Sequence, residues 1–318
     1  MGQQVKQEDK NLAHDHISVQ VFQLLEDIES GGQEIAPRGL KVREVQLAAL
    51  DVNPIYPIMN FEPRKFNYKY FAGELAWYLK AQTSIDFINN FSGFWKNICP
   101  SGHANSNYGN LLFNPHPSTI DTDTGGINVN QLEWVYDSLI KDTNTRQAVA
   151  FFNSPFFQHP QNKDFVCTLY MNFWIRKNTL DMKVQMRSND IFFGLTYDAP
   201  WFSAIMQSMY LNLKETYPAL KLGYYYHSAD NIHYYEKHGD QNHFELANNI
   251  LDSTLDSSIG MTLKHPLFRF DQNRKIYISA EAKNFVDSLD AIVAKPEEFK
   301  KLKQADYKFL LEDLIAWS

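Results

Sequence analysis

Cysteine and glycine are both scarce in this chain. Two cysteines, Cys99 and Cys167, and 14 glycines occur among 318 residues. Two thiols are too few for a disulfide-built scaffold or a cysteine-rich zinc module, so both classes are excluded. No apolar run approaches the ~18 residues that a membrane-spanning helix needs. The first ten residues are polar and lack the apolar core of a secretion signal. We therefore expect a cytoplasmic protein with free thiols.

Positive charge is in deficit. The chain has 30 Lys and Arg against 37 Asp and Glu, a formal net charge of −7. A broad nucleic-acid-binding surface needs a net basic face, so a general nucleic-acid coat is excluded. A local basic pocket for one anionic ligand is still compatible with this balance. The histidines between 227 and 243 are irregularly spaced and have no cysteine partner, so no metal site is expected.

Hydrophobic periodicity predicts one α+β domain over residues 1–318. Apolar residues at helical spacing predict four helices, at residues 18–28, 66–82, 128–140 and about 200–216. Val-, Phe- and Tyr-rich runs predict strands of one sheet at residues 148–153, 165–175, 180–186 and 223–226. Asn178 is expected in a hairpin turn. The expected irregular parts are a flexible tail at 1–16 and a surface loop at 101–126, and the region 244–318 is expected to be mostly helical.

Several side chains could act in catalysis or ligand binding, and each of them also has a simpler structural explanation. Cys167 lies in an apolar run, where a cysteine is a small hydrophobe unless a cation lowers its pKa. Arg187 and Ser188 directly follow a predicted strand and suit either a phosphate or an ordinary polar turn. Glu74 lies among aromatic residues, either on a solvated helix face or as a pocket acid with a raised pKa.

Six motifs occur in the order and spacing of a known family. They are Glu74-Leu75-Ala76-Trp77-Tyr78, Asn107-Tyr108-Gly109, Cys167, Arg187-Ser188-Asn189-Asp190, Phe193-Gly194 and His233-Tyr234-Tyr235. This set resembles the thymidylate synthase superfamily, and most of all its phage-type deoxycytidylate (dCMP) hydroxymethylases. The chain departs from thymidylate synthases in having Val166-Cys167-Thr168 where they carry Pro-Cys-His.

The resemblance implies a fold and a reaction. The fold is a central mixed β-sheet with helices packed on one side, the other sheet face forming a homodimer interface. The reaction places a one-carbon unit from 5,10-methylenetetrahydrofolate on C5 of a pyrimidine nucleotide, through a covalent bond from Cys167 to C6. No metal, nucleic-acid or membrane partner is implied, and a phage-encoded enzyme would work in the host cytoplasm.

The resemblance also assigns roles to individual positions. Those with a catalytic match are Cys167, Glu74, Asp198 and Tyr108. Those that match nucleotide-binding positions are Arg38, Arg146, Arg187, Ser188, Asn189, Asp198, His233 and Tyr235. Trp95 and Asp190 match positions that contact the folate. Arg146 matches an arginine that reaches the phosphate in the neighbouring subunit, and Gln147 stands where the family usually has a second arginine.

Asp198 is the position that selects the base. Thymidylate synthases place an asparagine there, whose amide matches the acceptor at O4 and the donor at N3 of uracil. Cytosine reverses this pattern, and a carboxyl group can accept from N4 while sharing a proton with N3. The simpler alternative is that Asp198 caps the following helix. We expect dCMP hydroxymethylation; the alternatives are dCMP methylation, a dUMP- or CMP-specific enzyme, and an inactive nucleotide-binding homologue.

Overall fold

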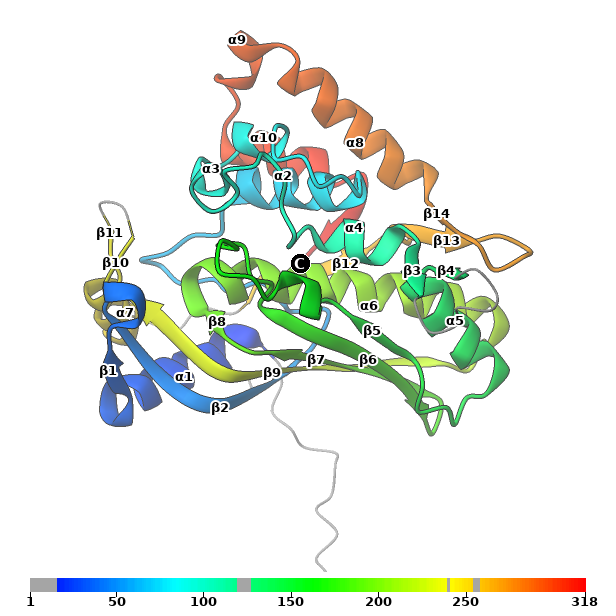
Figure 1. Cartoon of the computed structure of the whole chain (residues 1–318), viewed down its shortest axis with the longest axis horizontal. Helices are drawn as coiled ribbons and strands as arrows, with labels where there is room; N and C mark the ends of the chain where they lie inside the picture. The colour runs from blue at the N-terminus through cyan, green and yellow to red at the C-terminus, as the bar shows by residue number, and fades with distance from the viewer. Residues whose placement is uncertain (1–15, 119–126, 239–240, 254–257) are drawn as a thin grey trace, which may run out of the picture.

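The computed structural model describes residues 16–118, 127–238, 241–253 and 258–318. Its base is a seven-stranded sheet in the order β1-β2-β9-β7-β6-β5, with β8 beside β9 (Figure 1). The strands are β1 (Gln33–Ile35), β2 (Val42–Val52), β5 (Val149–Phe151), β6 (Thr168–Arg176), β7 (Thr179–Met186), β8 (Asn189–Asp190) and β9 (Lys221–Tyr235). Neighbours are antiparallel, except that β7 and β8 pair with β9 in parallel. The predicted α+β class with a mixed sheet is confirmed.

The alternating pattern of β7 shows why the sheet has one covered face. Leu180, Met182 and Val184 are fully buried, whereas the residues between them are only partly buried. Successive strand residues point to opposite faces, so the apolar set lies under the helices. The β6–β7 hairpin turns at Lys177 and Asn178, with φ of 50° and 59°. Two successive left-handed residues are typical of a tight hairpin turn, as predicted for Asn178.

The four predicted helices are confirmed. They are α1 (Ile17–Gly31), α2 (Tyr68–Leu79), α5 (Gln131–Lys141) and α6 (Thr196–Thr216). Figure 1 shows α6 running along one face of the sheet, with α2 and the short helices α3 (Phe94–Ile98) and α4 (Tyr108–Phe113) stacked beyond it. No helix in the described part of the chain is both long and apolar enough to cross a membrane.

The prediction of a surface loop over residues 101–126 is wrong at residues Tyr108–Phe113, which form the helix α4. Asn107 caps this helix by accepting a hydrogen bond from the N–H of Asn110 at 2.7 Å. Gly109 packs directly on the backbone of α2, because a Cβ there would lie 1.6 Å from the carbonyl oxygen of Tyr78. The short strands β3 (His116–Ser118) and β4 (Ile127–Val129) follow, and residues 119–126 lie outside the described part. Asn and Gly, which suggested a loop, here serve as a cap and a close contact.

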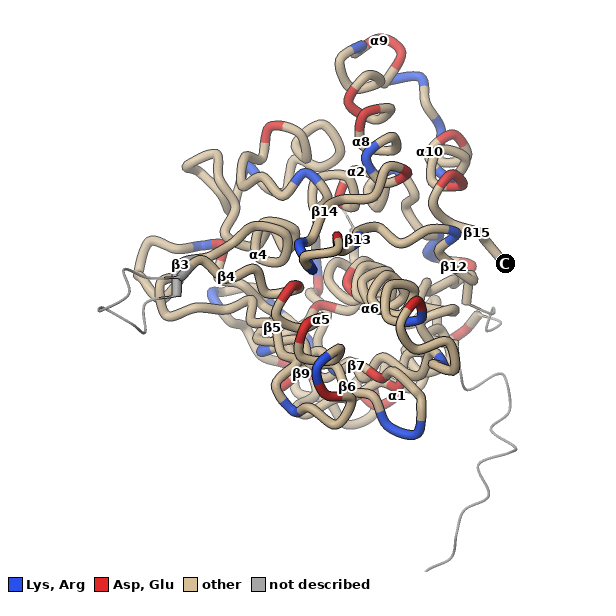
Figure 2. Tube along the Cα trace, turned by 90° about the vertical axis from the view of Figure 1, so that its right-hand side faces the viewer, with Lys and Arg blue, Asp and Glu red and all other residues tan. Residues whose placement is uncertain are grey.

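The C-terminal region is only partly helical, so the helical prediction for 244–318 needs correction. Four short strands pair there as β12 (Met261–Leu263) with β15 (Ile315–Trp317), and β13 (Phe268–Phe270) with β14 (Ile276–Ile278). The accompanying helices are α7 (His243–Leu251), α8 (Ala280–Val293), α9 (Pro296–Phe299) and α10 (Gln304–Leu311). Figure 2 shows acidic and basic residues side by side along α8, α9 and α10. Three-residue strands are too short to show an alternating pattern, which explains why periodicity missed them.

Candidate active site

Cys167 and Arg187 are brought together by the β6–β7 hairpin. Cys167 directly precedes β6 and Arg187 directly follows β7, and the ladder pairs Thr168 with Met186. The backbone N–H of Arg187 donates to the carbonyl oxygen of Cys167 at 2.9 Å. Its Nη2 lies 3.4 Å from the Cys167 Sγ and also donates to the carbonyl oxygen of Phe165 at 2.7 Å. The guanidinium is therefore fixed beside the thiol.

The two cysteines have different surroundings. Burial raises the pKa of the Cys167 thiol, and Asp198 and Asp164 add to the rise, whereas Arg187, the strongest of the nearby charges, and Arg38 lower it. Cys99 is buried, lies 3.6 Å from a carboxylate oxygen of Asp164 and has a pKa raised to about 12 by burial and by that carboxylate. A thiolate needs a cationic neighbour. Cys167 has one, whereas Cys99 faces an anion.

Glu74 lies inside the molecule, so its solvated-face alternative is wrong. The residue is 8% exposed, and its Oε1 accepts a hydrogen bond from the Tyr70 hydroxyl at 2.7 Å. Burial raises the pKa of Glu74 to about 8, with a smaller contribution from the nearby carboxylate of Asp198. Burial likewise raises the pKa of Asp198 to about 7. Two coupled acids of this kind can hold and release a proton near neutral pH.

Asp198 does not cap α6. The helix begins at Thr196, with Leu195 in the N-cap position, so Asp198 lies within the first turn. Its Oδ2 instead accepts a hydrogen bond of 2.8 Å from the side-chain amide of Asn189. Gly194 leaves room for this pair, because a Cβ there would lie 2.5 Å from the amide nitrogen. The carboxyl group therefore points toward Asn189, on the side of the molecule where Cys167 lies.

Tyr108 completes the group around Cys167. It is 6% exposed, at the start of α4, and its hydroxyl accepts a hydrogen bond from Thr168 Oγ1 at 2.8 Å. Tyr108 interacts electrostatically with Asp198, Cys167 and Glu74. The structure thus brings the four predicted catalytic residues to one place, from the start of β6 and from α2, α4 and α6.

Several predicted nucleotide-binding residues lie beside Arg187. The Ser188 hydroxyl donates to Asn231 Oδ1 at 3.3 Å, and the same oxygen lies 2.8 Å from His233 Nδ1. The Tyr235 ring packs edge-on against His233 at 5.2 Å. Burial, with Arg187 and Arg38 nearby, lowers the pKa of His233 to about 4, so its imidazole is neutral. Arginine, hydroxyl and neutral imidazole together offer donors to a phosphate and a sugar.

Arg146 is not at the site of its own chain. It is exposed and lies three residues before Val149, which pairs with Asn172 in the middle of β6. Extrapolating this register places Arg146 about eight residues along β6 from Cys167, roughly 25 Å at ~3.3 Å per residue. Gln147 beside it is also exposed.

The two predicted folate residues both have largely enclosed side chains. Trp95 is 6% exposed, and its ring packs against Trp77 at 4.7 Å. Asp190 accepts hydrogen bonds at Oδ1 from the N–H groups of Phe192 and Phe193, at 2.7 and 2.6 Å. Its Oδ2 is buried, and burial raises the pKa of Asp190 to about 6.

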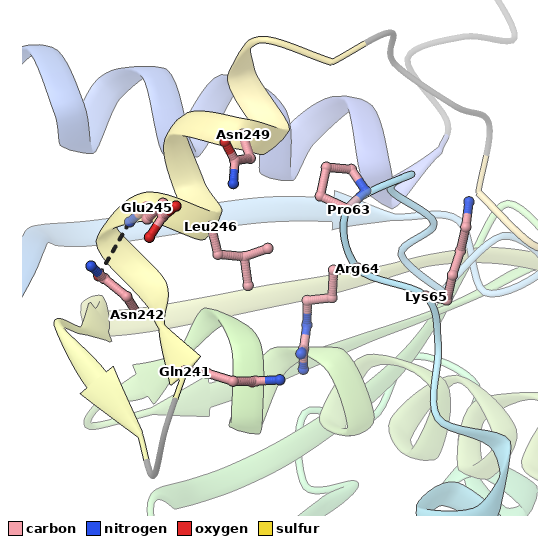
Figure 3. Close-up of a pocket in the computed structure, with 8 residues that line it drawn as sticks. All are labelled: Pro63, Arg64, Lys65, Gln241, Asn242, Glu245, Leu246 and Asn249. Atoms are coloured by element: carbon pink, nitrogen blue, oxygen red, sulfur yellow. Dashed lines mark hydrogen bonds between the residues drawn. The ribbon is translucent and has the colours of Figure 1, made fainter.

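Sequence reasoning missed three residues that contact the site. Tyr70, four residues before Glu74 on one helix face, gave a usable signal. Tyr225 and His227 lie on the same face of β9, where Tyr225 is hydrogen-bonded to His227 and His227 to Asn189. Aromatic residues are common in strands, so this pattern gives no functional signal by itself. A separate cavity of about 350 Å³ lies between residues 63–65 and α7, and none of the predicted site residues lines it (Figure 3).

Comparisons with known proteins find one family model and several relatives. A family model described as thymidylate synthase matches residues 22–272. The deoxyuridylate hydroxymethyltransferase of Bacillus phage SP01 is 28% identical over 230 residues, covering 67% of this chain and 55% of that protein. The deoxycytidylate 5-hydroxymethyltransferase of Enterobacteria phage T4 is 26% identical over 180 residues, 54% of this chain and 69% of that protein. The chain thus spans about half the length of the SP01 relative.

Proposed function

The chain belongs to the thymidylate synthase family, and from this premise we propose that it is a folate-dependent C5 hydroxymethyltransferase acting on dCMP. The substrates are dCMP, water and 5,10-methylenetetrahydrofolate, and the products are 5-hydroxymethyl-dCMP and tetrahydrofolate. The observation that carries the choice of base is the Asp198 carboxyl group, held in the Cys167 site by Asn189. The relatives alone leave the base open, because one is named for deoxyuridylate and another for deoxycytidylate.

The proposed chemistry begins at Cys167. Its thiolate adds to C6 of cytosine, and the electron pair of the C5–C6 double bond moves to C5, which becomes nucleophilic. Arg187 supports the thiolate, and Arg38, Ser188, His233 and Tyr235 hold the phosphate and sugar. When bound, methylenetetrahydrofolate supplies the one-carbon unit.

Proton transfers then fall to the buried acids and to Tyr108. The C5 proton leaves to a water bound at the neutral Tyr108 hydroxyl, which Thr168 holds by a hydrogen bond, and passes from there to solvent. Once the bond between the new carbon at C5 and the departing tetrahydrofolate has broken, a water held by Glu74 would add to that carbon, and the ionised form of Glu74 would take the proton that this water loses. Expulsion of the thiolate from C6 restores the aromatic ring. Asp198 holds the N3–N4 edge throughout.

A homodimer is part of the proposal. Arg146 is far from Cys167 of its own chain, so it can meet a phosphate only in a second subunit. The sheet face away from the helices carries a stacked pair, Trp174 and Tyr226, with ring centroids 5.8 Å apart. Such a partly apolar sheet face suits a symmetric interface. Each subunit is proposed to be one domain.

Mass analysis of the product tests the proposed function. The protein is incubated with dCMP and methylenetetrahydrofolate, and 5-hydroxymethyl-dCMP is expected. A methyl product accompanied by dihydrofolate absorbance supports the methyltransferase instead, since hydride would then replace water. Turnover of dUMP in preference to dCMP supports the activity named for the SP01 relative. Absence of turnover with either nucleotide supports the alternative of an inactive nucleotide-binding homologue.

Replacing Glu74 by glutamine is expected to lower kcat for hydroxymethyl-dCMP formation by about 10²–10³-fold, the usual effect of losing a general acid–base group. The KM for dCMP should change little, because the residue handles water rather than the nucleotide. Tyr70→Phe, which removes the 2.7 Å hydrogen bond to Glu74 and leaves the carboxyl group in place, is expected to lower kcat by about tenfold. Activity of Glu74→Gln within threefold of the parent would exclude this role.

Binding of dCMP is expected to weaken as pH rises. The bound cytosine edge needs one proton shared between Asp198 and N3, and the pKa of Asp198 in the free protein is raised to about 7 by burial. The proton is present below that pKa and must be taken from solvent above it, so Kd rises up to about tenfold per pH unit between pH 7 and 9. Calorimetry on Cys167→Ala isolates this step from the covalent one. A Kd independent of pH over that range contradicts the shared proton.

A further inference from the structure

A chain of buried side chains leads from β9 to the carboxyl group of Asp198. Tyr225 and His227 on β9 are 0% and 1% exposed, and Asn189 on β8 is 3% exposed. The Tyr225 hydroxyl lies 2.6 Å from His227 Nδ1, and His227 Nε2 lies 3.2 Å from Asn189 Oδ1. The Asn189 amide nitrogen then donates to Asp198 Oδ2 at 2.8 Å.

The hydrogen bonds of this chain have one direction. An ionised carboxylate only accepts, so the Asn189 amide turns its NH₂ group toward Asp198 and its oxygen toward His227. His227 is neutral, because burial lowers its pKa to about 3. Its single proton therefore lies on Nε2, where it donates to Asn189, and Nδ1 accepts from the Tyr225 hydroxyl. Every donor in the chain points toward Asp198.

The reverse direction is disfavoured by Tyr225. If Asp198 carried its proton on Oδ2, the Asn189 amide and the His227 tautomer would both have to reverse. The Tyr225 hydroxyl would then accept from Nδ1 and would need another acceptor for its own hydrogen. Within the described part of the chain this hydroxyl makes no hydrogen bond except that to His227. A buried donor without a partner is costly, so the forward direction is retained.

We propose that His227, with Tyr225 behind it, is a positioning residue for base selection, keeping Oδ2 of Asp198 an acceptor and placing any proton on Oδ1. This inference rests on the proposed function, since it concerns how that site chooses cytosine. The N4 amine of cytosine can donate to Oδ2, while N3 faces the protonated Oδ1. Uracil would set its O4 acceptor against Oδ2. His227 thus helps to exclude dUMP without touching the nucleotide.

Three variants of the full-length protein test this hydrogen-bonded series of side chains. His227→Met removes the donor to Asn189 with an apolar side chain, His227→Gln supplies an amide donor in its place, and Tyr225→Phe removes only the terminal hydroxyl. The measured quantity is the ratio of kcat/KM for dCMP to that for dUMP. We expect this ratio to fall at least tenfold in His227→Met and about threefold in Tyr225→Phe, and to stay near the parent value in His227→Gln. Thermal unfolding shows which variants are folded.

The outcomes separate the two proposals. A folded His227→Met or Tyr225→Phe protein that loses activity on both nucleotides alike has only a structural defect, and the inference is wrong. An unchanged ratio in both variants overturns it too, as does a loss in His227→Gln as large as in His227→Met. If His227→Met does not fold, Tyr225→Phe decides alone. A parent protein that prefers dUMP overturns the proposed function, and this inference with it.

Discussion

Replacing Cys167 by alanine is expected to abolish release of tritium from C5 of labelled dCMP, with a fall in rate of at least about 10⁴-fold. The reason is chemical, because C5 of cytosine becomes nucleophilic only after a nucleophile has added to C6. Removal of a nucleophile typically costs several orders of magnitude even when the rest of the site is intact. Tritium release reports loss of the C5 proton and therefore does not depend on whether water or hydride completes the reaction.

The second cysteine supplies a matched control. Cys99→Ala makes the same chemical change at a buried thiol that faces Asp164 instead of an arginine. We expect it to keep at least a third of the parent activity, although loss of a buried side chain can lower stability by about 1 kcal/mol. Cys167→Ala should still bind dCMP, which calorimetry can show. Substantial tritium release by Cys167→Ala would rule out the proposed nucleophile.

Secondary structure was predictable where periodicity ran over many residues. α6 and the β6–β7 hairpin have long apolar patterns with a clear break between them, and the structure confirms them. α4 was not predictable, because its six residues contain a glycine that packs on Tyr78 and an asparagine cap before it. Both residues have loop-like propensities, and only the neighbouring helix makes them suitable for this position.

The site depended on a different kind of information. From its local sequence, Glu74 could lie on a solvated face, and only the packing of α2 beneath other helices buries it. Cys167 and Arg187 are twenty positions apart, and a hairpin with one turn makes them neighbours. The family motifs predicted these residues because they carry tertiary information that periodicity lacks. His227 is in no motif, so its contact with Asn189 emerged only from the structure.

Replacing Asp198 by asparagine is expected to lower the ratio of kcat/KM for dCMP to that for dUMP by about 10²-fold, equivalent to about 2.7 kcal/mol. Most of the change should be a gain for dUMP. The ionised carboxylate repels O4 of uracil and offers it no donor, whereas an amide can donate to O4 and accept from N3. Asp198→Ala, which removes the group without adding a donor, should lower activity on both nucleotides. A dCMP preference unchanged in Asp198→Asn would mean that the charge at position 198 does not by itself select the base.

Rotation of the side-chain amide in Asp198→Asn by a half-turn would exchange its donor and acceptor ends, and the amide could then hydrogen-bond cytosine instead of uracil. The orientation of this amide therefore decides which base is preferred. In Asp198→Asn the chain from His227 would still present the NH₂ group of Asn189, which favours the amide oxygen at the place of Oδ2 and so limits, without abolishing, the gain for dUMP. Combining Asp198→Asn with His227→Met frees the amide to turn. The double variant is therefore expected to lower the ratio about tenfold further than Asp198→Asn alone, a change in specificity that a loss of stability by itself would not produce. Equal ratios in the single and double variants would show that position 198 selects the base without help from β9.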